Sequence, residues 1–252
     1  MTDEREHCKN RFLELAKKSY NSDIFTFTDF LGLAEQDAFA EVKSQIHQVE
    51  YTEFGGTPGT ERIMVRFGSP DDFGYDVPFP IVTLKVEPLS QKFADKLTHR
   101  DFLGTILGLG IDRVKLGDIA IIDNVGYVFA SEDIADYILR ELSRIKHTDV
   151  RVSVVTDLPE GSLFRTEEKY IQFQSERLDA VIAKTHSLSR DDAQSLFKKG
   201  LVFVCGRQII SPSYTPKEND VISVRGFGRL IYKGQVSTSR KGKLNVKIEM
   251  YV

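Results

Sequence analysis

Residues 177–234 read RLDAVIAKTHSLSRDDAQSLFKKGLVFVCGRQIISPSYTPKENDVISVRGFGRLIYKG, and this stretch decides the architecture of the C-terminal third. Apolar residues at helical spacing from residue 178 onward predict a short first helix. Ser189 is a favoured N-cap residue, and Gly200 ends the second helix that this cap begins. The short apolar runs that follow are separated by Pro, Gly and Asn-Asp turns, which predicts short strands.

The second predicted helix has two different sides. Ala193, Leu196 and Phe197 form an apolar stripe that we expect to be buried. Arg190 and Lys198 lie beside that stripe, so they remain free to contact a partner. The amides of a helical first turn also favour phosphate groups.

Charge divides the chain into two parts of opposite sign. Residues 176–252 contain 14 Lys and Arg against 7 Asp and Glu, whereas residues 1–175 contain 20 against 30. Such asymmetry indicates that the basic part meets a polyanion. The predicted RNA contacts are Arg177, Arg190, Lys198, Lys199, Arg207, Arg225, Arg229 and Lys233.

The C-terminal stretch resembles the S4 domain, an RNA-binding fold. The motifs that carry the resemblance are Arg177-Leu178-Asp179, Leu188-Ser189-Arg190, Gly200–Val204 with Gly206, and Asn219-Asp220-Val221-Ile222. The resemblance implies that two helices and the turn after them contact folded RNA. Asp192 and Gln194 stand at positions that are often basic in the family, and Cys205 replaces a common Asn.

The rest of the chain predicts two further units, so the expected fold class is α+β with three small units. Residues 1–75 form an acidic α+β domain with two helices and a pair of strands, and the Gly, Pro and Asp residues of 68–80 form a boundary. Residues 81–160 follow the order β-α-β-β-α-β, the split βαβ arrangement of RRM-like and ferredoxin-like domains. Residues 157–175 are expected to be a connector, and residues 176–252 the S4 module with a final strand at 244–252.

The middle unit contains a helix start at Thr98-His99-Arg100-Asp101. Thr98 and Asp101 have the spacing of a capping box. His99 and Arg100 stand in the first turn, where they are a candidate secondary RNA contact. The simpler interpretation is that the pair only flanks the cap.

Over nearly its full length the chain resembles the bacterial YlmH family. The residues that carry this are Leu97–Gly104, Gly117-Asp118-Ile119 and the C-terminal S4 module. The resemblance implies that the middle unit also binds RNA, that the protein associates with large ribosomal subunits blocked by peptidyl-tRNA, and that the family is linked to cell division. The implied partners are rRNA and tRNA.

Composition limits the remaining function classes. No apolar run is long enough for a membrane span and the N-terminus lacks a signal peptide, so we expect a cytoplasmic protein. Cys8 and Cys205 stand alone, and no cofactor or metal site is predicted.

Three functions remain open at this level. The first is a non-enzymatic RNA-binding factor. The second is an rRNA- or tRNA-modifying enzyme with an unrecognised active site in residues 1–160, although the motifs of pseudouridine synthases, S4-linked methyltransferases and tyrosyl-tRNA synthetases are missing. The third is a cell-division adaptor whose acidic N-terminal domain binds a protein partner.

Overall fold

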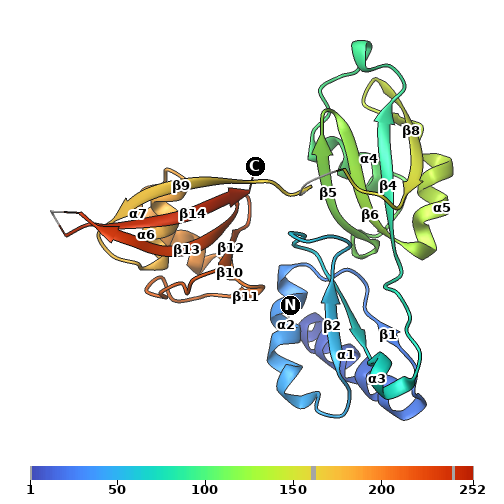
Figure 1. Ribbon diagram of the computed structural model, residues 1–252, viewed down its shortest axis with the longest axis horizontal. Helices are drawn as coiled ribbons and strands as arrows, with labels where there is room; N and C mark the ends of the chain where they lie inside the picture. The colour runs from blue at the N-terminus through green and yellow to red at the C-terminus, as the bar shows by residue number, and fades with distance from the viewer. Residues whose placement is uncertain (1, 160–162, 240–241, 252) are drawn as a thin grey trace. The chain divides into compact units, whose positions relative to one another are not determined.

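The computed structural model describes residues 2–159, 163–239 and 242–251. The chain divides into two compact units, unit 1 (residues 1–164) and unit 2 (residues 165–252). None of the helices in the described ranges combines the length and apolarity that crossing a bilayer requires. Helices and several small sheets mix in both units, so the predicted α+β class is confirmed (Figure 1).

The N-terminal part of unit 1 is a three-stranded antiparallel sheet with helices. Its elements are α1 (Thr2–Ser22), β1 (Thr26–Phe27), α2 (Leu33–Val42), the 3-10 helix η1 (Lys43–Gln45), β2 (Tyr51–Phe54), β3 (Met64–Phe67) and α3 (Pro70–Phe73), and the strand order is β1-β3-β2. Phe12 of α1 and Phe39 of α2 meet edge to face at 5.1 Å in the core. The second helix starts at Leu33 and leaves α-helical geometry after Val42.

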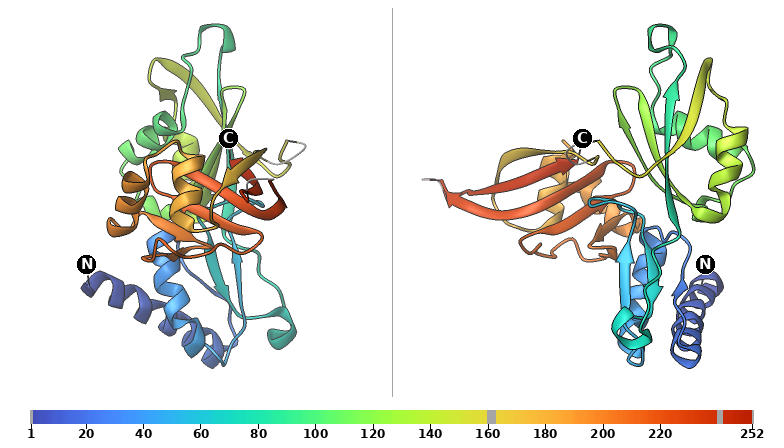
Figure 2. Two further views of the ribbon diagram at one scale, coloured as in Figure 1. Left: turned by 90° about the vertical axis from the view of Figure 1, so that its left-hand side faces the viewer. Right: turned by 45° about the vertical axis from the view of Figure 1, so that its right-hand side comes forward.

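The second part of unit 1 has the predicted β-α-β-β-α-β order. Its elements are β4 (Ile81–Pro88), η2 (Gln91–Phe93), α4 (His99–Gly108), η3 (Arg113–Lys115), β5 (Leu116–Ile122), β6 (Val125–Ser131), α5 (Glu132–Glu141), β7 (Arg144–Ile145) and β8 (Thr148–Val155). The sheet order is β5-β6-β4-β8-β7, with every neighbouring pair antiparallel. Both helices cover one face of this sheet (Figure 2), where Phe102 and Ile138 are fully buried.

The two parts of unit 1 share a cluster of buried residues on the face opposite those helices. Phe30 and Met64 from the first part pack there with Tyr127 and Phe129 of β6. The sequence boundary at 68–80 therefore separates two sheets that lie within one compact unit.

Unit 2 is a six-stranded antiparallel sheet covered on one face by two helices. Its elements are β9 (Thr166–Phe173), α6 (Leu178–Thr185), α7 (Arg190–Lys198), β10 (Val202–Val204), β11 (Arg207–Gln208), β12 (Asp220–Val224), β13 (Gly228–Thr238) and β14 (Leu244–Tyr251). The strand order is β11-β10-β12-β13-β14-β9. The predicted final strand is present as β14, with Val246 and Ile248 fully buried.

Strand β9 corrects the expectation that residues 157–175 are only a connector. Thr166 to Phe173 pair residue by residue with β14, from Thr166 opposite Tyr251 to Phe173 opposite Leu244. The sheet of unit 2 consequently begins about ten residues before the predicted S4 boundary.

Candidate nucleic-acid interface

Helices α6 and α7 form the frame of the predicted RNA-binding surface. Ser189 caps α7, since its Oγ accepts the backbone N–H of Asp192 at 3.0 Å. Leu196 and Phe197 are buried as the apolar stripe requires, whereas Lys198 is exposed. The first turn of α7 also carries Asp191 and Asp192. Their negative charge offsets the positive end of the helix dipole, so a phosphate near this helix start would depend on cationic side chains and not on the α7 amides alone.

Asp179 is the centre of a polar cluster between the two helices. Its side chain is fully buried and accepts hydrogen bonds from Nε and Nη2 of Arg177, both at 3.1 Å. Gln194 of α7 donates to the same carboxylate at 3.1 Å, and Nε of Arg190 lies 3.5 Å away. Burial pushes the pKa of Asp179 upward, but the hydrogen bonds from Arg177 and Gln194 and the nearby arginine charges outweigh it, so the pKa lies below its ordinary value.

This cluster changes the interpretation of three predicted positions. Gln194 was noted as a departure from a basic position, and it supplies a third donor that joins α7 to α6. Arg177 donates two hydrogen bonds to Asp179, and Arg190 forms an ion pair with it. The role of Asp179 in joining the two helices was not predicted from the sequence. The one indication was its position two residues after Arg177, at the start of a predicted helix.

Lys198 and Lys199 at the end of α7, and Arg207 of β11, are not held by Asp179. Lys198, Lys199 and Arg207 are exposed, and within the described part of the chain none of them has an ion-pair partner. Arg225 directly follows β12, and its backbone N–H donates to the carbonyl of Leu201 at 2.9 Å. Its guanidinium carbon is 5.0 Å from the ring centroid of Phe203.

Arg229 and Lys233 lie on the opposite face of the sheet from α6 and α7. They alternate along β13 with Leu230 and Tyr232, which are buried in the core beneath the helices. The guanidinium of Arg229 stacks 4.2 Å from the ring centroid of Tyr251, and Lys233 pairs with Glu249 at 3.6 Å. The structure therefore does not bring these two predicted contacts together with the cations of the helical side.

The secondary candidate pair lies in unit 1 at the start of α4. The capping box predicted at Thr98 and Asp101 is confirmed: Oδ2 of Asp101 accepts both the backbone N–H of Thr98 at 2.8 Å and its hydroxyl at 2.6 Å. His99 and Arg100 both have exposed side chains. Neighbouring protein atoms and the positive charge of Arg113 lower the pKa of His99.

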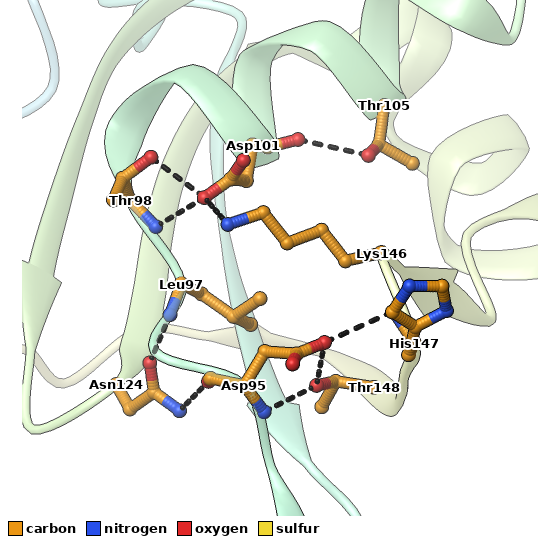
Figure 3. A network of polar contacts seen from close by, with 9 residues as sticks. All are labelled: Asp95, Leu97, Thr98, Asp101, Thr105, Asn124, Lys146, His147 and Thr148. Atoms are coloured by element: carbon orange, nitrogen blue, oxygen red, sulfur yellow. Dashed lines mark hydrogen bonds and ion pairs between the residues drawn. The ribbon is translucent and has the colours of Figure 1, made fainter.

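Figure 3 shows the polar network around this helix start. Nζ of Lys146 lies 2.7 Å from the carboxylate of Asp101. Asp95 and Asn124 fix the preceding segment through bonds to Thr148, His147 and the backbone of Leu97. The network is a rigid support for the segment that ends at Thr98.

We predict that Asp101→Asn lowers the melting temperature at neutral pH and that the difference from the native protein narrows as the pH falls below about 4. The hydrogen bonds from Lys146 and Thr98 lower the pKa of Asp101 to about 2, below its ordinary value of 3.8. A depressed carboxyl pKa stabilises the fold above the unfolded pKa, and this stabilisation is lost as the pH falls toward the folded pKa. Thermal melts of both proteins at pH 7, 5, 4 and 3 measure the narrowing gap.

Lys146→Gln is the matched control for this prediction, because it removes the same ion pair from the other side. An equal difference in melting temperature between Asp101→Asn and the native protein at pH 7 and pH 3 would contradict the stabilising role of the Asp101 charge.

The segment before the network presents two apolar side chains that sequence reasoning did not select. Phe93 is 81% exposed and Leu89 is 66% exposed. Nζ of Lys92 lies 5.5 Å from the ring centroid of Phe93. The available signal was a pair of large apolar residues inside a polar turn that fits neither helical nor strand spacing.

Gly117 and Asp118 join the two sheets of unit 1. A Cβ on Gly117 would lie 2.7 Å from the ring of Phe30, so only glycine permits this approach. The Asp118 carboxylate accepts the backbone N–H groups of Glu61 and Arg62, the latter at 3.3 Å. This motif is explained by the packing of the unit.

Metal and thiol chemistry have little support in the described residues. Within those ranges no group of three or more His, Cys, Asp or Glu side chains could hold a metal ion. Cys8 and Cys205 are free thiols.

Comparison with known proteins agrees with the resemblance carried by the sequence motifs. Residues 76–157 match the family described as "Putative RNA-binding domain in YlmH". The chain is 29% identical over 231 residues to the Ribosome-associated protein quality control protein P2 of Bacillus subtilis. This alignment covers 88% of this chain and 86% of that protein. It is 41% identical over 61 residues to the small ribosomal subunit protein uS4 of Acidothermus cellulolyticus, or 24% of this chain and 29% of that protein.

A solved structure, the cell division protein ylmH from Streptococcus pneumoniae, aligns with 60% of this chain and 91% of that one, at 21% identity and a TM-score of 0.47. The predicted resemblance to the YlmH family is confirmed by the family match and the long alignment. The names of the matched proteins describe RNA-binding and ribosome-associated proteins.

Proposed function

We propose that this chain, a relative of the YlmH-type proteins, is a cytoplasmic, non-enzymatic factor that binds structured RNA of the large ribosomal subunit. We further propose that it acts in the rescue of subunits blocked by peptidyl-tRNA. The observation that carries the proposal is a set of exposed cations, Lys198 and Lys199 at the end of α7 and Arg207 of β11, which have no ion-pair partner in the described ranges. The ribosome-associated relative supports the choice of ribosomal RNA.

The geometry favours binding through phosphate groups. Ammonium and guanidinium groups that are not already paired form charge-assisted hydrogen bonds with phosphate oxygens. Asp179 fixes α6 and α7 against each other, so the side chains on the helices are presented by a rigid frame. The negative charge of unit 1 repels RNA and so opposes non-specific binding. RNA is therefore expected to contact the basic surface of unit 2.

Sedimentation of tagged chain through a sucrose gradient tests the proposal. We expect the chain in the large-subunit fraction, enriched when peptidyl-tRNA is retained on that subunit. Recovery only in protein complexes free of RNA would instead support the cell-division adaptor. Altered nucleotides in RNA incubated with the chain would support a modifying enzyme.

We predict that RNA binding weakens steeply with salt. If about five phosphates are neutralised, the logarithm of the association constant falls with the logarithm of the salt concentration at a slope of roughly −3.5 to −4.5. Filter binding or fluorescence anisotropy between about 50 and 300 mM KCl measures the slope. An affinity that does not change with salt would contradict the electrostatic contact.

A further inference from the structure

Unit 2 contains a cavity of about 760 Å³ beside strand β9. One wall is formed by residues 170–175, the end of β9 and the turn after it. Ala180, Ala183 and Lys184 of α6 also line it, as do Leu188 and Arg190 at the start of α7. Its volume is in the range of sites that hold one small organic molecule, about 300–1,000 Å³.

The charged residues of the cavity are all cations. Lys184, Arg190 and Lys243 are exposed and line it, and the residues that line it include no Asp or Glu. Arg190 is oriented by Asp179 through its Nε, so its remaining N–H groups are available to an anion. This rim of charge suits a phosphate group.

The rest of the lining suits a flat, partly polar ring. Ile171, Ala180, Ala183 and Leu188 provide an apolar floor, and the two alanines, three residues apart on α6, leave space above that helix. Among the strands of the described residues, β9 is an edge strand that pairs with β14 alone, and no described strand pairs with the backbone on its other side. Such backbone groups can form hydrogen bonds with the edge of a base.

We propose that this cavity binds a single unstacked nucleotide of the RNA, with the base on the apolar floor and a phosphate at Lys184, Arg190 and Lys243. Only an unpaired nucleotide can place its base in such a cavity, since paired bases are stacked inside the helix. The inference rests on the proposed function and deepens it: the chain recognises a bulge, loop or end next to the RNA helix that its other cations bind. Arg190 links the two contacts, because it lines the cavity and begins α7.

Hairpins that differ in one bulged nucleotide test the proposal with the full chain. We expect the native protein to bind at least one of the four bulged hairpins (A, C, G or U) about tenfold more tightly than the fully paired hairpin, in line with the contribution of a single stacked base. Ala183→Phe fills the cavity and should bind both kinds of hairpin equally, with affinity for the paired hairpin unchanged. Lys184→Ala combined with Lys243→Ala should lose the same preference without filling the cavity.

Lys169→Ala is the matched control, because it removes a cation from the same strand outside the cavity lining. It should keep the preference, and 4-thiouridine at the bulge should cross-link within residues 170–190. Melting temperatures verify that each variant is folded. Equal binding of all hairpins by the native protein, or an Ala183→Phe variant that is folded and keeps the preference, would overturn the nucleotide site. Failure to bind any hairpin or ribosomal RNA would instead refute the proposed function.

Discussion

Reversing two exposed charges of unit 2, Lys198→Glu at the end of α7 with Arg207→Glu in β11, should reduce affinity for ribosomal RNA about a hundredfold and leave the fold intact. Each change converts an attractive phosphate contact into a repulsive one. Both side chains are exposed and have no ion-pair partner in the described ranges, so their loss costs only about 0–1 kcal/mol of stability each. Anisotropy titrations and thermal melts of the same preparations measure the two effects.

The structure explains why this pair is preferred to a reversal at Arg190. Nε of Arg190 lies 3.5 Å from the buried Asp179 carboxylate. A glutamate at that position would place a second negative charge beside a buried one, so a loss of binding could come from loss of structure.

Arg165→Glu with Lys169→Glu is the matched control, since it makes the same charge change at and before β9. This control should keep most of the affinity. A comparable loss in both double variants would show that net charge, and not a defined surface, determines binding. Full affinity of Lys198→Glu with Arg207→Glu would place the RNA contact elsewhere.

The spacing of apolar residues and the residues typical of turns and helix caps predicted those helices and strands in which buried residues recur at regular intervals. The split βαβ order of the middle unit, the Ser189 cap and the buried stripe of α7 were all accessible because apolar residues recur at fixed spacing. β9 was missed because TEEKYIQF contains only one fully buried side chain, Phe173, and its strand geometry depends on pairing with β14. The end of α5 at Glu141 could not be predicted from its apolar spacing, since it depends on the pairing of Arg144 and Ile145 with β8.

Charge counting identified the basic part of the chain but could not assign its side chains to faces. Arg229 and Lys198 were predicted from the same feature, a cation in a basic stretch. The alternation of β13 about Leu230 and Tyr232 puts Arg229 on the face away from the helices. The role of Asp179 depends on donors 2 and 15 residues away, a contact that no local pattern specifies.

Phe197→Ala should have the opposite effect to the charge reversal, because Phe197 lies in the core. Its side chain is 2% exposed and belongs to the core cluster with Leu178, Val181 and Val202. Removing a fully buried phenylalanine ring costs about 3–5 kcal/mol, through lost burial and the cavity that remains. Urea denaturation followed by hydrogen exchange in residues 165–252 measures the loss of stability.

Lys199→Ala is the control for this variant, since an exposed lysine two residues further along should change stability by no more than about 0.5 kcal/mol. RNA affinity of Phe197→Ala, measured under conditions where unit 2 is still folded, should stay close to that of the native chain. Phe197 and Lys198 are neighbours in sequence, but on a helix neighbouring side chains point in directions about 100° apart. One is therefore buried against the sheet and the other reaches solvent, and this difference separates the residue that holds the fold from the residue proposed to bind phosphate. A large loss of affinity in folded Phe197→Ala would mean that the RNA surface includes the packing of α7 itself.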